Sequence, residues 1–197
     1  MKLSAPLVLA SASPRRKALL EQLGLEFIVH ESNADESISA DLSPEEIVEI
    51  LSHRKARAVA DVHLSALTLA ADTLVYLNGT ILGKPKSDED AAEQLRLLSG
   101  RSHEVLTGFA LIHPPTERVA QATQKTTVEF AELSDEEIDA YVSTGLPMDK
   151  AGSYGIQDRW GAIFVQNITG DYNTVVGLPL RRFYSTLRTE FPDLIEI

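Results

Sequence analysis

Four side chains with hydroxyl or guanidinium groups occur together near the start of the chain: Ser11, Ser13, Arg15 and Arg16. They follow an apolar run at 6–10, which indicates a strand, and lead into a helix predicted over 14–23 and closed by Gly24. Backbone N–H groups and the positive end of a helix dipole meet at such a corner, which therefore favours anions. Forked guanidinium groups suit phosphate oxygens. The alternative is a capped helix with solvated arginines, and the spacing alone leaves both interpretations open.

A single carboxylate interrupts the apolar segment 67–77, which predicts a buried central strand followed by an Asn78-Gly79 hairpin turn. This carboxylate, Asp72, is costly to bury unless it meets a cation, a metal or hydrogen-bond donors. A strand that buries only one face would instead leave it in solvent. Lys84 lies twelve residues further on, where a hairpin can return it to the same edge of the sheet.

Three other charged residues are weaker candidates. Lys55 lies on a helix predicted over 44–62, and Asp35 and Glu36 lie in a polar loop expected through Asp41. Carboxylate oxygens suit a hard cation, but isolated loop acids are commonly solvated, and a helical lysine commonly belongs to an exposed face. The five histidines fit no zinc-binding spacing, and the chain has neither a nucleophile elbow nor a Walker loop.

Composition restricts the class of protein. The chain has 197 residues, 44% hydrophobic and 24% charged, which suffices for one sizeable core. A net charge of −11 argues against a general nucleic-acid binder and against attraction to an anionic membrane. Without cysteine, a metal must be held by oxygen or imidazole. The first residues imitate a short signal peptide, but Pro6 interrupts the apolar run, so we expect a buried strand and a cytoplasmic protein.

Strand and helix patterns alternate along the rest of the chain, which predicts an α/β fold with a mixed sheet in one domain over 1–197. The further strands expected are 26–31, 103–112, 118–130 and 162–167. The further helices expected run from Ser87 to Gly100, from Ser134 for a short distance, and over 178–189.

These pieces together resemble the Maf family, which is named for septum inhibition and contains nucleoside triphosphate pyrophosphatases. The matching pieces occur in family order over essentially the whole chain: Leu9-Ala10-Ser11-Ala12-Ser13-Pro14-Arg15-Arg16, Lys55-Ala56, Ala71-Asp72-Thr73, Gly83-Lys84-Pro85, Leu98-Ser99-Gly100, Asp149-Lys150-Ala151-Gly152-Ser153-Tyr154-Gly155-Ile156-Gln157 and Val176-Gly177-Leu178-Pro179. Any one of them is weak, whereas the ordered set is specific.

The resemblance implies a mixed sheet flanked by helices around a deep cleft, a fold shared with inosine triphosphate pyrophosphatases. It also implies hydrolysis of a nucleoside triphosphate to the monophosphate and pyrophosphate. Asp72 matches the proposed catalytic base. Positions associated with catalysis or triphosphate binding are matched by Ser11, Arg15, Arg16, Glu36, Lys55 and Lys84.

Three positions that separate the subfamilies are matched by Arg15, Thr73 and Gln157. This combination resembles the dTTP/UTP branch, whereas the 7-methyl-GTP branch has a tryptophan, a glutamine and a glutamate there. We expect Gln157 and Thr73 to bind the pyrimidine edge, with Arg16 serving the phosphates and Arg15 helping to select the nucleotide. A broader or modified-nucleotide preference, or a nucleotide-sensing, division-regulating binding protein, are the alternatives.

The chain departs from the family pattern at Arg54, where relatives commonly have glutamate. If that acid assists metal binding, Glu36 or Asp35 must replace it here. We expect Glu36 and Asp72 to bind Mg²⁺ or Mn²⁺. The expected partner is the nucleotide, with a homodimer as a candidate assembly and neither nucleic acid nor membrane.

Overall fold

The computed structural model describes residues 1–39 and 41–196. The chain divides into two compact units: unit 1 comprises Met1–Asp72, Thr107–Gln124 and Gly177–Ile197, and unit 2 comprises Thr73–Leu106 and Lys125–Val176. The single domain expected over 1–197 stays a prediction. The expected polar loop through Asp41 includes residue 40, which lies outside the described residues.

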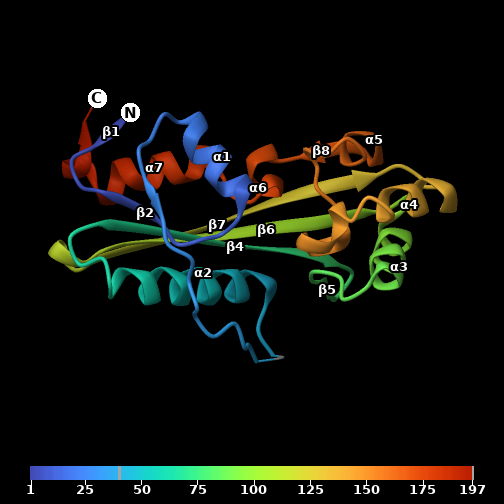
Figure 1. The fold of residues 1–197 in the computed structure, drawn as a ribbon, viewed down its shortest axis with the longest axis horizontal. Helices are drawn as coiled ribbons and strands as arrows, with labels where there is room; N and C mark the ends of the chain where they lie inside the picture. The colour runs from blue at the N-terminus through green and yellow to red at the C-terminus, as the bar shows by residue number, and fades with distance from the viewer. Residues whose placement is uncertain (40, 197) are drawn as a thin grey trace. The chain divides into compact units, whose positions relative to one another are not determined.

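The main sheet has the strand order β3-β2-β4-β6-β7-β8, with β5 paired to β4 (Figure 1). Its strands are β2 (Leu7–Leu9), β3 (Ile28–Val29), β4 (Leu67–Leu77), β5 (Thr80–Leu82), β6 (Ser102–His113), β7 (Arg118–Phe130) and β8 (Val165–Thr169). β2 pairs parallel with β3 and β4, whereas β5 and β8 pair antiparallel with β4 and β7. The short strands β1 (Lys2–Leu3) and β9 (Ile195–Glu196) pair separately. The predicted mixed sheet is therefore confirmed.

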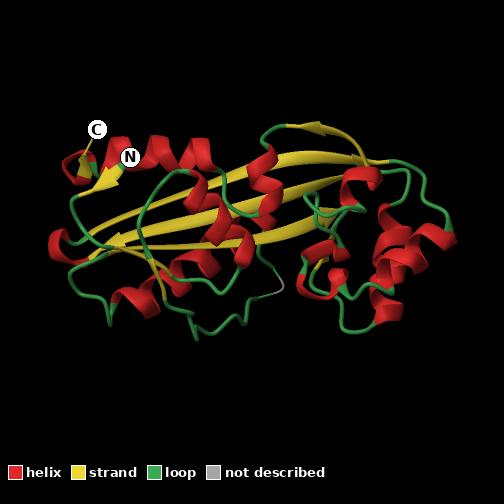
Figure 2. Ribbon diagram, turned by 45° about the horizontal axis from the view of Figure 1, so that its top comes forward, coloured by secondary structure: helices red, strands yellow, loops and turns green. Residues whose placement is uncertain are grey.

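Helices flank the sheet, as Figure 2 shows by colour. They are α1 (Pro14–Gln22), α2 (Pro44–Ala60), α3 (Asp88–Leu98), α4 (Asp135–Val142), α5 (Gly161–Phe164), α6 (Tyr172–Val176) and α7 (Leu180–Glu190). Short 3₁₀ turns occur at Pro114–Thr116, Leu146–Asp149, Ala151–Ser153 and Pro192–Leu194. Several helices begin where serine caps were predicted. Ser43 and Glu46 form a reciprocal capping box at α2, which satisfies two backbone N–H groups.

In unit 1, helices cover both faces of the sheet, with α2 on one side and α1 and α7 on the other (Figure 1). Consecutive residues of β6 serve the two faces because side chains alternate along a strand. Phe109 packs edge-on against Phe183 of α7, with ring centroids 6.1 Å apart. A Cβ at Gly108 would lie 2.7 Å from the backbone oxygen of Val48 on α2. The absence of a side chain at Gly108 therefore lets α2 lie close to the sheet.

The core of unit 2 is aromatic. Phe130 contacts Tyr154 and Phe164, with ring centroids 4.8 and 6.2 Å apart, and Tyr141 contacts Phe164 at 5.5 Å. His103 joins this cluster, and its Nε2 lies 2.8 Å from the hydroxyl of Tyr154. Burial lowers the pKa of His103 to about 4, so the ring is neutral at pH 7. Its Nδ1 is buried and has no hydrogen-bond partner among residues 1–39 and 41–196.

Two strand predictions need correction. The strand predicted over 162–167 is wrong in its first half, because residues 161–164 form α5 and only Val165–Thr169 is extended. There the N–H groups of Ala162 and Phe164 donate to the carbonyls of Asp158 and Trp160, which continues a turn from the preceding loop. The strand predicted over 26–31 is reduced to Ile28–Val29. Within the described part of the chain, no helix is long and apolar enough to cross a membrane.

Candidate functional site

The loop between β2 and α1 is held by its own hydroxyl groups. Ser11 Oγ accepts hydrogen bonds from the backbone N–H of Ser13 at 3.2 Å and from Nη1 of Arg16 at 3.1 Å. Ser13 is the N-cap of α1, and its Oγ accepts from the backbone N–H of Arg16 at 3.4 Å. The loop therefore caps the start of α1 and also holds the Arg16 side chain in place. The capped helix and the anion-binding corner, which the sequence left as alternatives, are compatible with each other.

Arg16 is half-buried and fixed from two sides. Its Nε donates to the carbonyl of Gly177 at 2.9 Å, while its Nη1 reaches Ser11. Burial lowers the pKa of Arg16, and the nearby charge of Asp72 opposes that shift while Arg15 adds to it. The group still carries its positive charge at neutral pH because the intrinsic pKa of arginine is so high. A fixed, partly desolvated cation of this kind suits an anionic ligand.

Lys55 of α2 links two carboxylates within unit 1. Its Nζ donates to Oδ1 of Asp72 at 2.6 Å and lies 3.0 Å from Oε1 of Glu36. The Lys55 and Asp72 side chains are 14% and 15% exposed, whereas the Glu36 side chain is 63% exposed. The structure thus brings together Asp72, Lys55 and Glu36, which are far apart in sequence. Asp72 meets the cation that its buried position requires.

Arg54 takes part in this arrangement indirectly. Its Nη1 donates to the backbone carbonyls of Ser37 at 2.6 Å and Asp35 at 3.3 Å, on either side of Glu36. The carboxylate of Asp35 accepts from the backbone N–H and the hydroxyl of Ser37, and these bonds lower the pKa of Asp35. Of the two loop acids considered as substitutes at this site, Glu36 is the one that contacts Lys55, while Asp35 folds back on its own loop.

The remaining candidates belong to unit 2. Thr73 follows Asp72 on β4 and is half-buried. Lys84 is exposed in the loop after β5, where the carbonyl of Gly83 accepts a hydrogen bond from the N–H of Gly152 at 3.1 Å. Gln157 is exposed and its Nε2 donates to Oδ1 of Asp158 at 3.3 Å.

Three residues that the sequence analysis gave no role surround this glutamine segment: Tyr141, Lys150 and Asp158. Tyr141 donates from its hydroxyl to Oδ2 of Asp158 at 3.1 Å and accepts from the N–H of Gly155 at 3.3 Å. Lys150, only 7% exposed, has its Nζ 3.3 Å from the same Oδ2 and 2.7 Å from Oδ1 of Asp149. The signal available in the sequence was the charged pair Asp149-Lys150 within the matched piece 149–157.

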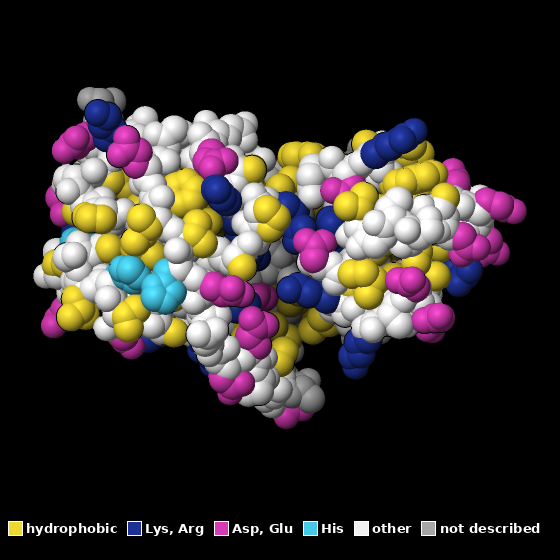
Figure 3. All heavy atoms as spheres, in the orientation of Figure 1, with side chains coloured by type: hydrophobic (Ala, Val, Ile, Leu, Met, Phe, Trp, Pro, Cys, Tyr) yellow, Lys and Arg dark blue, Asp and Glu magenta, His cyan; other side chains and the backbone are white. Residues whose placement is uncertain are grey.

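Acidic and basic side chains are interspersed on the face shown in Figure 3. The fixed cation of Arg16 and the lysine-held carboxylate of Asp72 can bind phosphate oxygens and orient or deprotonate a water molecule. These two side chains belong to a mixed sheet and its flanking helices. The fold and the site together define an α/β protein of the kind that acts on phosphorylated ligands.

Residues 6–190 match the family model described as Maf-like protein, and the chain belongs to that family. It is 51% identical over all of its length to a Salinibacter ruber protein named dTTP/UTP pyrophosphatase, of which the match covers 96%. It is 52% identical to a Geobacillus protein of the same name, with 89% of this chain and 93% of that protein covered. The solved Staphylococcus aureus Ham1 protein aligns with 64% of this chain and 72% of its own, at 18% identity and a TM-score of 0.49.

Proposed function

We propose that this protein hydrolyses dTTP and UTP to the nucleoside monophosphate and pyrophosphate. The observation that carries the proposal is the half-buried Asp72 carboxylate bound by Lys55, beside the fixed guanidinium of Arg16. The names of the two relatives, each more than 50% identical, support the choice of dTTP and UTP.

A divalent metal is part of the proposal, and the donor set fits one. Glu36 and Asp72 supply hard carboxylate oxygens that converge on the ammonium group of Lys55. Among residues 1–39 and 41–196, no group of three or more histidine or acidic side chains could hold a metal. Mg²⁺ or Mn²⁺ suits that shortage because such ions often use one or two carboxylates together with substrate phosphates and water. When bound, the ion would neutralise phosphate charge and polarise the scissile anhydride.

The roles we propose for the side chains follow from their contacts. Lys55 holds Oδ1 of Asp72 and so fixes the plane of the carboxylate, which orients the attacking water and takes its proton. The bond between the α-phosphorus and the α–β bridging oxygen then breaks, and pyrophosphate leaves. Arg16 and Lys55 offset the charge that builds on the leaving group, and we propose the same role for Lys84.

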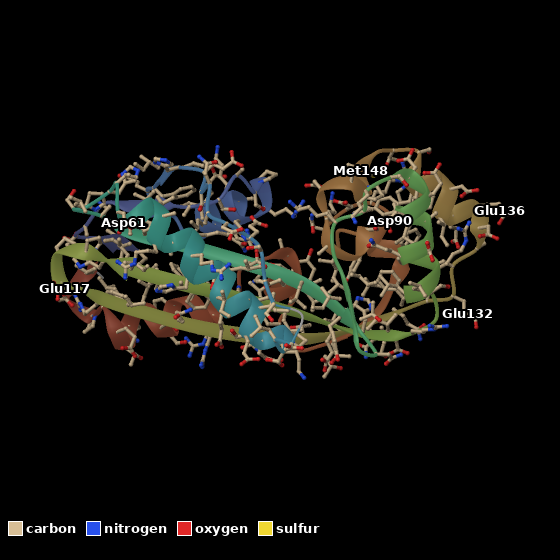
Figure 4. All side chains as sticks on the ribbon, turned by 90° about the horizontal axis from the view of Figure 1, so that it is seen from below. Asp61, Asp90, Glu117, Glu132, Glu136 and Met148 are labelled. Carbon is tan, nitrogen blue, oxygen red and sulfur yellow. The ribbon has the colours of Figure 1, made fainter. Side chains whose placement is uncertain are left out.

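The test is release of pyrophosphate from a panel of common and modified nucleoside triphosphates, each with Mg²⁺ or Mn²⁺. We expect dTTP and UTP to be the best substrates, and Asp72→Asn to abolish turnover while nucleotide binding is kept. Asp61→Asn is the matched control, because Asp61 lies at the end of α2 with a 64% exposed side chain (Figure 4). Undiminished turnover in Asp72→Asn would remove Asp72 from the mechanism, and tight binding without any release would favour a nucleotide sensor.

Base selection is proposed for Gln157 and Thr73, with Arg15 contributing. An amide can both donate to and accept from the edge of a uracil or thymine ring. Gln157→Glu should weaken turnover of UTP and dTTP selectively. An equal loss for every nucleotide would instead assign Gln157 to stability or catalysis.

A further inference from the structure

We propose that Asp158 sets the direction of the Gln157 side-chain amide and thereby makes the protein select pyrimidines that carry an N3–H donor. The inference rests on the proposed function, because it deepens the role of Gln157 in binding the base. It concerns unit 2 alone, where the donors and acceptors around Asp158 fix which end of the glutamine amide faces outward.

The carboxylate of Asp158 is held in one orientation. Its Oδ2 accepts from the hydroxyl of Tyr141 at 3.1 Å and faces Nζ of Lys150 at 3.3 Å. The backbone is held as well, since the N–H of Asp158 donates to the carbonyl of Gly155 at 2.9 Å. The side chain is only 14% exposed. With Oδ2 bound by two donors, Oδ1 is the oxygen directed at Gln157.

The groups that pack against Asp158 face it with hydrogen-bond donors. Lys150 is itself buried and surrounded by acceptors: the carbonyl of Leu146 and the carboxylates of Asp149 and Asp158. Burial and the adjacent Asp158 charge raise the pKa of Tyr141, so its hydroxyl remains a donor across the neutral range. Both neighbours therefore present donors to the carboxylate of Asp158.

The orientation of the Gln157 side-chain amide follows from which neighbouring groups can donate and which can accept a hydrogen bond. An ionised carboxylate only accepts, whereas a side-chain amide has one donating and one accepting end. Oδ1 of Asp158 therefore takes the Nε2 end of Gln157, as the 3.3 Å contact has it. Turning the amide over would place Oε1 against a carboxylate oxygen, with two acceptors facing each other. Gln157 consequently presents Oε1, an acceptor, as its outward end.

An outward acceptor distinguishes the pyrimidines by one proton. Uracil and thymine carry N3–H, which can donate to Oε1 of Gln157. Cytosine has an unprotonated N3, which is an acceptor, so a cytosine bound in the same position would place N3 against Oε1 without a hydrogen bond, and its 4-amino group could donate only if the base shifted. A site that offers one end of a hydrogen bond rejects a ligand lacking the other. Because Gln157 is exposed, water relieves part of this penalty, and we expect a preference for UTP over CTP of about ten- to a hundredfold in kcat/KM.

The experiment compares UTP, CTP and N3-methyl-UTP with the full chain, together with calorimetric binding of UMP and CMP. The wild-type protein should use CTP and N3-methyl-UTP poorly, since neither can donate from N3. In Asp158→Asn the new amide can donate to Oε1 of Gln157, which lets the glutamine turn and present Nε2. The UTP-to-CTP ratio should then fall about tenfold or more. Asp135→Asn, a 71% exposed acid of the same unit, is the matched control and should leave the ratio unchanged.

Each possible result either supports or contradicts the role of Asp158. An unchanged ratio in Asp158→Asn, or an equal loss for UTP and CTP, overturns the inference. So does efficient use of N3-methyl-UTP by the wild-type protein, a result that needs no variant and holds even if Asp158→Asn fails to fold. If no nucleotide is hydrolysed, the proposed function fails by itself. Binding of UMP over CMP that is lost in Asp158→Asn would still support the role of Asp158.

Discussion

Replacing Lys55 of α2 by methionine removes an ammonium group while keeping most of the length of the side chain. Its Nζ lies 2.6 Å from Oδ1 of Asp72 and 3.0 Å from Oε1 of Glu36. The two ion pairs share one cation but differ in environment, because the Asp72 side chain is 15% exposed and that of Glu36 is 63% exposed. The pair with Asp72 should therefore contribute much more to stability than the pair with Glu36.

The expected coupling energy of each ion pair depends on how far solvent screens its charges. Two unit charges about 4 Å apart attract by about 4 kcal/mol at an effective dielectric constant of about 20. Desolvation of both groups and ordering of the lysine oppose this attraction. We expect a net coupling between Lys55 and Asp72 of about 1 to 3 kcal/mol in the free energy of unfolding. For Lys55 and Glu36 the expected coupling is about 0.2 to 1 kcal/mol, as in other exposed pairs.

Urea unfolding followed by circular dichroism at pH 7 measures both couplings through double-mutant cycles. The variants are Lys55→Met, Asp72→Asn and Glu36→Gln, with the two double variants that contain Lys55→Met. The cycle is needed because removal of one active-site charge can stabilise a protein by itself. A coupling to Glu36 as large as that to Asp72, or a coupling to Asp72 under about 0.5 kcal/mol, would refute the reasoning.

Three further predictions concern pH, packing and metal. Because folding lowers the pKa of His103 from 6.5 to about 4, the stability from its neutral ring is fully present above pH 6.5 and declines as the pH falls toward 4. The loss between pH 8 and pH 5 should be about 2 kcal/mol in urea unfolding, and His103→Phe should lack it. The same dependence of stability on pH in His103→Phe and the wild-type protein would contradict this. Gly108→Ala should destabilise the protein by about 1 to 3 kcal/mol, because its Cβ would lie 2.7 Å from a backbone oxygen of α2. Gly83→Ala should leave the melting temperature unchanged, because a Cβ there would have no atom of the described residues within 4 Å. Equal melting temperatures for the two variants would contradict the close approach at Gly108. Removal of divalent ions with EDTA should abolish pyrophosphate release and added Mg²⁺ or Mn²⁺ should restore it, whereas full turnover without metal would exclude the ion.

Short-range sequence patterns, such as helix caps and turn residues, predicted most of the helices and strands. The capping serines Ser43, Ser87 and Ser134 mark the starts of α2, α3 and α4, because an N-cap is decided within one helical turn. The turn at Asn78-Gly79 could also be predicted, because Asn-Gly favours hairpin turns in which both residues have positive φ. In the structure these φ angles are 47° and 92°. The strand predicted over 162–167 failed because α5 depends on hydrogen bonds to Asp158 and Trp160 in the preceding loop, and apolar side chains alone could not reveal them.

Only part of the candidate site could be predicted from the sequence. A carboxylate at Asp72 within an apolar segment predicted a cation, a metal or hydrogen-bond donors beside it, but nothing in the sequence singled out Lys55 as that cation. Glu36 reaches Lys55 because Arg54 binds the backbone on either side of it, a contact across 17 and 19 positions that leaves no local pattern. The network of Tyr141, Lys150 and Asp158 was missed because Tyr141 reaches Asp158 across 17 positions, although Lys150 in the matched piece 149–157 was a signal that could have been followed.

The hydrogen bond between Gln157 and Asp158 also constrains how base preference can evolve. In the branch that the sequence analysis associated with 7-methyl-GTP, the position of Gln157 holds a glutamate. Introduced here, a glutamate at 157 would put two carboxylates against each other beside the buried Lys150, and one of them would have to take up a proton or turn away. We therefore expect substitutions at positions 157 and 158 to be epistatic. A variant library that samples the two positions together should therefore reach combinations that single substitutions cannot.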